Sequence, residues 1–240
     1  MNIALIGYGK MGKIIEEIAI SRGHTITGKS SSKHPISTID FSNTDVAIEF
    51  TAPHFAVPHI EYCVDNNVPV VVGTTAWNEK LPYIKDYVTN KNGSLLYASN
   101  FSIGVNIFFD INKRLSKLMA GYKEYKPSIE EIHHLEKLDA PSGTAVSLAN
   151  DMMLENDNFS SWIHREDFKP ETSKKQIPVT SFREDGVPGT HEVSYESEID
   201  IIDIKHTAKN RTGFALGAVI SAEWLVDKKG IYTMQDVINL

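Results

Sequence analysis

The sequence predicts an α/β protein in which a doubly wound parallel sheet is followed by an α+β domain with a mostly antiparallel sheet. In the first hundred residues, short apolar runs alternate with helical patterns, which indicates parallel strands joined by right-handed crossovers. After about Gly104 the pattern changes, and alternating strand patterns dominate from Ile177 onward. An apolar helical pattern returns from Phe214. A domain boundary is therefore expected near residue 104.

Composition restricts the classes of function. The chain has 240 residues, of which 41% are hydrophobic and 23% charged, values typical of a globular protein. The net charge is −7 and no dense basic stretch occurs, which disfavours a nucleic-acid partner. No apolar run approaches the roughly 18 residues of a membrane span, and the N-terminus lacks the features of a signal peptide. The single cysteine, Cys63, suits a reducing compartment and is interpreted as a small buried side chain. A soluble, cytoplasmic protein without a membrane partner is expected.

Five strand patterns alternate with helical patterns in the first domain. The clearest helix places Ile14, Ile15, Ile18 and Ala19 on one face and closes at Gly23. Doubly wound sheets bind ligands at the carboxyl ends of their strands, and small or polar residues follow every predicted strand here. The predicted strands are 3–6, 24–27, 46–50, 68–72 and 95–98, and the segments that follow them are 7–9, 29–31, 51–53, 73–75 and 99–101.

The first strand leads directly into a loop with the pattern G-x-G-x-x-G. The first glycine permits a tight turn, the second lets a pyrophosphate approach the backbone, and the third allows helix and strand to pack closely. The helix N-terminus then offers free N–H groups and a partial positive charge to the diphosphate. Because the loop follows a strand and opens a helix, it predicts a Rossmann-like dinucleotide-binding domain. Its residues are Gly7, Tyr8, Gly9, Lys10, Met11 and Gly12.

The second domain begins with an amphipathic helical pattern over residues 105–119. Alternating apolar positions in 177–183 and 193–204 predict strands, and turn residues at 185–189 separate two of them. The polar stretch 156–175 is expected to be a surface segment.

The most distinctive feature of the second domain is a polar cluster between residues 131 and 145. Ser142 is a candidate N-cap for the apolar helical pattern that begins at Ala145. Gly143 would leave the first amides of that helix uncovered, which makes an anion site, although an ordinary capped helix is the alternative. His133 and Lys137 are four residues apart, so either a helix or a strand would present both on one face.

A metal site formed by His133, His134 and Glu136 is a competing interpretation of this cluster. The spacing matches no familiar zinc pattern, and adjacent histidines on a strand point in opposite directions. No metal is therefore expected.

At these residues the sequence resembles the dihydrodipicolinate reductase family of bacterial lysine and diaminopimelate synthesis. The resemblance covers nearly the whole chain, and the segment around His133 is far more specific to the family than the glycine loop. The matching segments are the glycine loop, 72–75, 98–106, 133–134, 137–145, 188–191 and 211–218.

The resemblance implies NAD(P)H-dependent reduction of 4-hydroxy-tetrahydrodipicolinate, a small dicarboxylate, to tetrahydrodipicolinate. It implies a homotetramer joined through the second-domain sheets. It also returns the last helix to the first domain, so residues 1–104 with 214–240 would bind the dinucleotide. Residues 105–213 would then form the substrate-binding and oligomerisation domain.

The resemblance also implies roles for individual residues. His133 and Lys137 would be the catalytic acid/base pair, and the ordinary titration of an imidazole near neutral pH suits His133 to proton donation. The expected substrate contacts are His134, Ser142, Gly143 and Thr144. The expected cofactor contacts are Gly7, Tyr8, Gly9, Lys10, Met11, Gly12, Lys29, Ser30, Phe50, Thr51, Gly73, Thr74, Thr75, Ala98, Ser99, Asn100 and Phe101.

The sequence departs from the family's pattern at three places. Leu135 and Glu136 stand where the family often has basic residues, and Ser128 stands where an acidic residue is usual. The glycine loop is one residue shorter than the commoner form. Glu136 lowers the positive charge near an anionic substrate, so substrate affinity is the property that this departure affects.

The segment after the second strand predicts the preferred dinucleotide. NAD-selective domains carry an Asp or Glu about 20 residues after the glycine loop, where it binds the ribose 2′-hydroxyl. Residues 29–34 contain no carboxylate and offer Lys29 and Lys33 instead. NADPH is therefore expected to bind more tightly than NADH, with Lys29 as the first contact and Lys33 as the second. A polar loop without cofactor contact is the alternative.

Two other functions fit parts of the sequence. Another two-domain NAD(P)-dependent dehydrogenase of an amino-acid-pathway intermediate would share the fold. One such enzyme, an acylating semialdehyde dehydrogenase, needs a catalytic cysteine. The only cysteine, Cys63, falls within a predicted helix of the first domain, which argues against that enzyme. A redox-sensing Rossmann protein that regulates transcription would need a DNA-binding module, and no basic helix-turn-helix pattern occurs.

Overall fold

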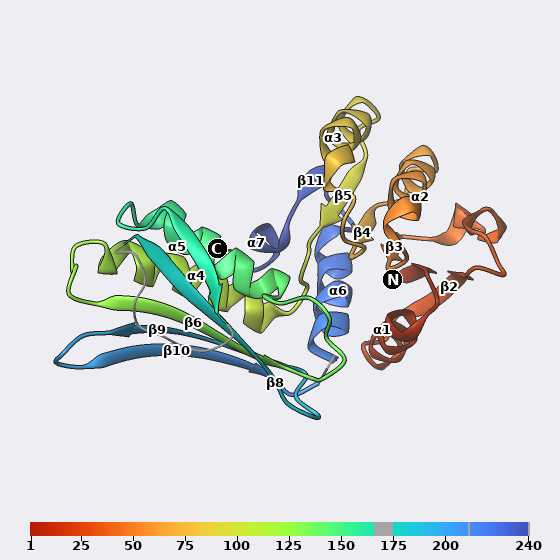
Figure 1. The fold of residues 1–240 in the computed structure, drawn as a ribbon. Coiled ribbons are helices and arrows are strands. Elements are labelled where there is room, and N and C mark those ends of the chain that lie inside the picture. The colour runs from red at the N-terminus through yellow and green to blue at the C-terminus, as the bar shows by residue number, and fades with distance from the viewer. Residues whose placement is uncertain (166–174, 211, 240) are drawn as a thin grey trace. The chain divides into compact units, whose positions relative to one another are not determined.

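The computed structural model describes residues 1–165, 175–210 and 212–239. By its internal contacts the chain forms two units (Figure 1), of which unit 1 comprises Met1–Ile103 with Thr212–Leu240 and unit 2 comprises Gly104–Arg211. These boundaries lie within two residues of those expected from the sequence and the resemblance. None of the helices in the described ranges is long and apolar enough to cross a membrane.

Unit 1 is built on a six-stranded sheet with the strand order β11-β5-β4-β3-β1-β2, and every pairing in it is parallel. The chain runs outward from β1 first to β2 and then, on the other side, to β3. The carboxyl ends of β1 and β3 therefore border the switch point at which doubly wound sheets bind ligands. The predicted doubly wound sheet is confirmed. Its strands are β1 (Asn2–Ile6), β2 (Thr25–Ser30), β3 (Val46–Glu49), β4 (Val70–Val72), β5 (Ser94–Tyr97) and β11 (Gly230–Tyr232).

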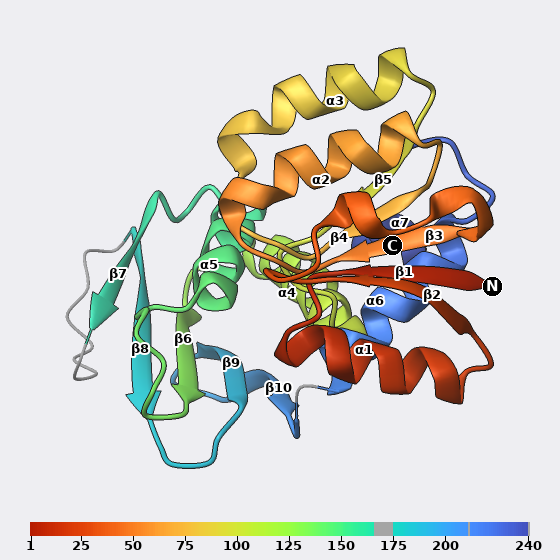
Figure 2. The same ribbon diagram turned by 90° about the vertical axis from the view of Figure 1, so that its right-hand side faces the viewer.

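Helices cover both faces of this sheet. Figure 2 shows α2 and α3 on one side and α1 and α6 on the other. Side chains of β1 point alternately to the two faces of the sheet. Ile3 and Leu5 belong to the apolar cluster on one face, and Ala4 and Ile6 belong to the cluster on the other. Cys63 is buried in α2, as expected. The helices are α1 (Lys10–Ser21), α2 (Pro53–Asp65), α3 (Leu81–Asn90), α6 (Thr212–Leu225) and α7 (Met234–Val237), and 3₁₀ turns span Ile36–Thr38, Phe41–Asn43 and Asn78–Lys80.

Two features of unit 1 differ from the expectation. The strand β2 continues to Ser30, which pairs with Ile6, so Lys29 and Ser30 lie within the strand and not in a loop after it. The glycine at position 28 suggests a strand end in the sequence, but parallel pairing with β1 carries the strand past it. The sequence does not predict the short edge strand β11, which forms by pairing with β5.

Unit 2 contains a five-stranded mixed sheet with the order β10-β9-β6-β8-β7. The antiparallel pairings join eight and seven residue pairs, against five for each parallel pairing, which confirms a mostly antiparallel sheet. Part of the stretch 156–175, expected as a surface segment, forms the edge strand β7, and residues 166–174 lie outside the described residues. The strands are β6 (Lys126–His133), β7 (Ser161–Arg165), β8 (Gln176–Arg183), β9 (Gly189–Glu196) and β10 (Ile201–Ala208).

One face of this sheet is covered by α4 (Ile103–Met119) and α5 (Gly143–Glu155), as Figure 1 shows. Phe108 of α4, Leu148 of α5 and Ile129 of β6 belong to the same apolar cluster. Every second residue of β6 is buried, and the last two of these are Glu131 and His133. The end of β6 therefore places two polar side chains under the helical cover.

Candidate active site

The glycine loop between β1 and α1 has the geometry that a diphosphate needs. Gly7 has a φ of +98°, and a Cβ on it would lie 2.0 Å from the carbonyl oxygen of Phe50. A Cβ on Gly12 would lie 2.6 Å from the carbonyl oxygen of Gly7, so helix and loop pack as closely as predicted. A Cβ on Gly9 would meet nothing within 4 Å, and no side chain caps α1. The first amides of α1, including those of Lys10 and Met11, are therefore available to an anion.

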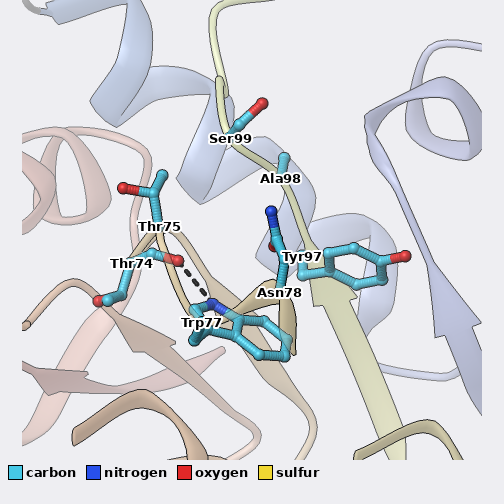
Figure 3. Close-up of a pocket in the computed structure, with 7 residues that line it drawn as sticks. All are labelled: Thr74, Thr75, Trp77, Asn78, Tyr97, Ala98 and Ser99. Atoms are coloured by element: carbon cyan, nitrogen blue, oxygen red, sulfur yellow. Dashed lines mark hydrogen bonds between the residues drawn. The ribbon is translucent and has the colours of Figure 1, made fainter. Parts of the chain in front are cut away.

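A pocket lies beyond the carboxyl ends of β4 and β5 (Figure 3). Trp77 Nε1 donates a hydrogen bond of 2.7 Å to the carbonyl oxygen of Thr74, which holds the turn after β4. The backbone N–H of Thr51 donates to Thr74 Oγ1 at 2.7 Å, so the segments after β3 and β4 are tied together. Four of the predicted cofactor contacts are among the lining residues, which are Thr74, Thr75, Trp77, Asn78, Tyr97, Ala98 and Ser99.

The other predicted contacts near this pocket are held by packing. A Cβ on Gly73 would lie 2.1 Å from the ring of Phe50, so a larger residue there would displace that ring. The ring centroids of Phe50 and Phe101 are 5.7 Å apart, and Phe101 is buried. Asn100 Oδ1 accepts a hydrogen bond of 2.9 Å from the backbone N–H of Ser102. The predicted cofactor residues of these segments thus lie at the carboxyl ends of the parallel strands.

An ion pair that the sequence does not reveal lies at the end of β2. Lys29 Nζ is 2.5 Å from Glu16 Oε1 and 4.5 Å from the centroid of the Tyr8 ring. The Tyr8 hydroxyl donates to the same carboxylate. The bond to Glu16 raises the pKa of Lys29, and the bond from Lys29 holds the pKa of Glu16 below its ordinary value. Glu16 lies on α1 and not in the segment after β2, where NAD-selective domains carry their acid. Lys33 is exposed.

A buried carboxylate, Glu131, organises the candidate substrate site in unit 2. Its Oε1 accepts hydrogen bonds from the backbone N–H of Ser142 at 2.9 Å and from the hydroxyl of Ser181 at 2.8 Å. Its Oε2 lies 3.5 Å from His191 Nε2 and 3.6 Å from His133 Nδ1. Burial raises the pKa of Glu131, but the adjacent His191 and the hydrogen bonds from Ser142 and Ser181 outweigh it and lower the pKa to about 2. Glu131 is therefore ionised near neutral pH and ties the start of α5 to β6.

His133 is the last residue of β6 and is buried beside this carboxylate. Burial lowers its pKa, Glu131 raises it, and the nearby charges of His191, Lys137 and Arg183 lower it again, to about 4. The imidazole is therefore neutral at pH 7. The sequence shows neither the burial of His133 nor the neighbouring cations, which together hold its pKa below the ordinary value of an imidazole.

Lys137 does not share an element with His133. The strand β6 ends at His133, and Lys137 lies beyond the turn that follows, so the argument from their four-residue spacing is wrong. Lys137 Nζ lies 2.9 and 3.0 Å from the carboxylate oxygens of Asp139. Arg183 donates to the carbonyl oxygens of Lys137 at 3.2 Å and Asp139 at 2.7 Å, and so holds the segment that carries Lys137. Glu136 is exposed, and Asp139 is the acid that pairs with Lys137.

The start of α5 has the predicted form. Ser142 Oγ accepts a hydrogen bond of 3.2 Å from the backbone N–H of Ala145, which confirms the N-cap, and lies 3.1 Å from His191 Nε2. A Cβ on Gly143 would meet nothing within 4 Å, so a ligand can approach the backbone there. Thr144 is half-buried in the first turn. Because Ser142 is engaged on both sides, it holds the turn, while Gly143 and Thr144 are free to face an anion.

Glu131, His133 and His191 are all buried, and one potential ligand atom from each lies within 4.8 Å of the others. This set differs from the metal site suggested by the sequence. One oxygen of Glu131 already accepts two hydrogen bonds, and Arg183 Nη1 lies 3.9 Å from it. Arg183 and Lys137 both place positive charge near His133, which opposes a divalent cation. Glu131 Oε2 and His133 Nδ1 have no hydrogen-bond partner among the described residues.

Unit 1 offers a dinucleotide site, and unit 2 offers cations, N–H donors and an imidazole suited to an anion and a proton. A glycine loop on a doubly wound sheet, together with such a cluster, defines the class of nicotinamide-dependent oxidoreductases. Residues 1–101 match the family model for the N-terminus of dihydrodipicolinate reductase, and residues 104–238 match the model for its C-terminus. The chain belongs to the dihydrodipicolinate reductase family.

Individual relatives extend over the whole chain. A 4-hydroxy-tetrahydrodipicolinate reductase from Christiangramia forsetii is 46% identical over 239 residues, which cover 100% of this chain and 98% of the relative. The reductase from Clostridium novyi is 36% identical, with 96% of this chain and 95% of the relative covered. The solved structure of a dipicolinate-bound dihydrodipicolinate reductase from Paenisporosarcina sp. TG-14 has a TM-score of 0.76 at 23% identity and covers 99% of both chains. An amine dehydrogenase from Mycobacterium smegmatis, at 11% identity, shares the fold with a TM-score of 0.61 over 98% of this chain and 95% of its own.

Proposed function

We propose that this chain reduces 4-hydroxy-tetrahydrodipicolinate to tetrahydrodipicolinate with NAD(P)H, a step of lysine and diaminopimelate biosynthesis. The observation that carries the proposal is the full-length similarity to reductases of that name. The cationic cluster of unit 2 supports it, because the substrate is a dianion. The reaction consumes one hydride and one proton and releases one water, so the protein must both bind carboxylates and transfer a proton.

His133 and Lys137 are the proposed proton-transfer pair. A bound dicarboxylate raises the pKa of His133 from about 4 toward neutrality, because a nearby negative charge favours the protonated imidazole. Lys137 exchanges the carboxylate of Asp139 for one of the substrate. The backbone of Gly143 and the hydroxyl of Thr144 bind the second carboxylate at the start of α5, and His134 is a further proposed contact. The bound nicotinamide supplies the hydride.

The proposed cofactor preference is NADPH over NADH. The open glycine loop and the uncapped α1 fit a dinucleotide diphosphate. Lys29 is the proposed contact to the 2′-phosphate, and Lys33 is the second. A partly exposed, charge-assisted contact predicts a preference of about tenfold, or about 1.4 kcal/mol. Calorimetric titration of both cofactors against wild type and the Lys29→Ala, Lys33→Ala double variant tests it, and equal wild-type affinities contradict it.

The proposed assembly is a homotetramer in the cytoplasm. The face of the unit 2 sheet opposite α4 and α5 carries Ile132, Phe182 and Ile201, of which Phe182 and Ile201 are 39% and 56% exposed. A second copy of this chain is the proposed occupant of that face. Light scattering is expected to report four chains, and Phe182→Glu is expected to lower the mass. A wild-type monomer excludes this assembly.

The activity is tested with a coupled assay that supplies the product of dihydrodipicolinate synthase and follows NADPH absorbance. Pyridine-2,6-dicarboxylate is expected to compete at millimolar concentration, because it offers the same two carboxylates without an easily reduced bond. Thr144→Val is expected to weaken substrate and inhibitor together, since it removes one hydroxyl donor. Thr144→Ser keeps the hydroxyl at the same position and is the matched control. Absence of NADPH oxidation by the wild type with this substrate overturns the proposal.

A further inference from the structure

Glu16 brings a carboxylate to the cation that is proposed to recognise the dinucleotide. It lies in the second turn of α1, and its Oε1 is 2.5 Å from Lys29 Nζ. The Tyr8 hydroxyl donates to Oε2, so both carboxylate oxygens have a partner. Lys29 also lies over the ring of Tyr8. The side chains of Glu16 and Lys29 are 17% and 39% exposed, so the pair is accessible to a ligand.

The backbone fixes where this group of three side chains stands. The N–H of Tyr8 donates to the carbonyl oxygen of Ser30 at 2.7 Å, and the N–H of Gly7 donates to the same oxygen at 3.2 Å. The glycine loop is therefore joined directly to the carboxyl end of β2. In doubly wound domains this end of the second strand faces the ribose 2′-position of the dinucleotide. An acid here discriminates against a 2′-phosphate, whichever element carries it.

We propose that Glu16 limits the preference for NADPH, because it neutralises Lys29, the proposed contact to the 2′-phosphate. The inference rests on the proposed contact between Lys29 and that phosphate. NADH lacks the phosphate, so its affinity depends little on the ion pair. Glu16 is thus a specificity-determining residue that acts against the 2′-phosphate of NADPH and makes no contact with the ribose hydroxyl of NADH, because both of its oxygens already have partners.

The experiment compares dissociation constants for NADPH and NADH, measured by calorimetry on the full-length protein. Glu16→Gln keeps the size of the side chain and removes its charge. It is expected to lower the dissociation constant of NADPH by about fivefold, which is the upper range for one exposed ion pair. The dissociation constant of NADH is expected to change by less than about twofold. Glu17→Gln is the matched control, because Glu17 is the adjacent, exposed acid of the same helix. Adenosine 2′,5′-bisphosphate and AMP are expected to repeat the difference without the nicotinamide.

Lys29→Met separates this inference from the proposed cofactor preference. If Lys29→Met weakens NADPH while Glu16→Gln behaves like Glu17→Gln, the Lys29 contact stands and the role of Glu16 is wrong. If Lys29→Met leaves the ratio of affinities unchanged, the proposed Lys29 contact is wrong and the inference falls with it. In the double variant the effect of Glu16→Gln is expected to shrink below about twofold. If Glu16→Gln still lowers the dissociation constant of NADPH by about fivefold in the Lys29→Met protein, Glu16 does not act through Lys29 and the inference is wrong.

Discussion

Removing the buried charge of Glu131 is expected to reduce the stability that unit 2 loses when the pH falls. The adjacent His191 and the hydrogen bonds from Ser142 and Ser181 lower the pKa of this carboxyl from 4.5 to about 2, so the unfolded chain binds its proton more tightly than the folded one. Stability from Glu131 is therefore complete above about pH 4.5 and is lost as the pH falls toward 2. The gap in pKa corresponds to at most about 3 kcal/mol, of which about 2 kcal/mol is lost at pH 3.

The measurement is urea unfolding of wild type and Glu131→Gln at pH 7, 4 and 3. Hydrogen exchange of the amides in β6 and β9 assigns the change to unit 2. Between pH 7 and pH 3 the wild type is expected to lose more stability than Glu131→Gln, by at most about 2 kcal/mol, because the variant has no proton to bind at position 131 while its His133, without Glu131 beside it, is harder to protonate. The amide of glutamine still accepts from Ser142 and Ser181, so the variant is expected to fold.

Glu130→Gln is the matched control, since Glu130 is the neighbouring residue on the opposite face of β6. It is expected to lose as much stability in acid as the wild type. An equal loss in wild type and Glu131→Gln would refute the reasoning, because it would show that the carboxyl titrates alike in the folded and unfolded chains.

Two further predictions concern turnover and packing. His133→Ala and Lys137→Ala are each expected to lower kcat by roughly 100-fold or more while NADPH affinity changes little, and near-wild-type turnover in either variant removes that residue from the mechanism. Gly217→Ala is expected to destabilise unit 1 by about 3 kcal/mol, because its Cβ would lie 1.7 Å from the carbonyl oxygen of Phe101. In Gly9→Ala the new Cβ meets nothing within 4 Å, so this variant is expected to keep the wild-type Tm but to bind NADPH more weakly in calorimetry. A Tm equal to wild type in Gly217→Ala contradicts the packing argument.

Local signals account for the parts of the fold that the sequence predicts. The runs at 3–6 and 46–50 are apolar throughout or nearly so because both faces of those strands are covered, and they form β1 and β3. Ser142 caps α5 because the capping bond spans only three residues. The end of β2 and the edge strand β11 depend instead on pairing with distant strands, and there the sequence pattern is insufficient.

The candidate site divides in the same way. Residue types and spacing place His133, Lys137 and the start of α5 near one another in the chain. They do not show that Lys137 lies beyond a turn and pairs with Asp139, or that burial and two cations leave His133 neutral at pH 7. The acid at the cofactor end of β2 is likewise invisible in the segment after that strand, because it belongs to α1.

The sequence by itself determined the doubly wound sheet, the glycine loop, the capped helix and the family, because each of these is written in short-range patterns or in residue identity. Only the tertiary structure decided the electrostatics of the site. Glu131 meets Ser181 across 50 positions, and Ser142 meets His191 across 49. Protonation depends on burial and on charges a few ångströms away, and such neighbours are chosen by the fold and not by separation along the chain.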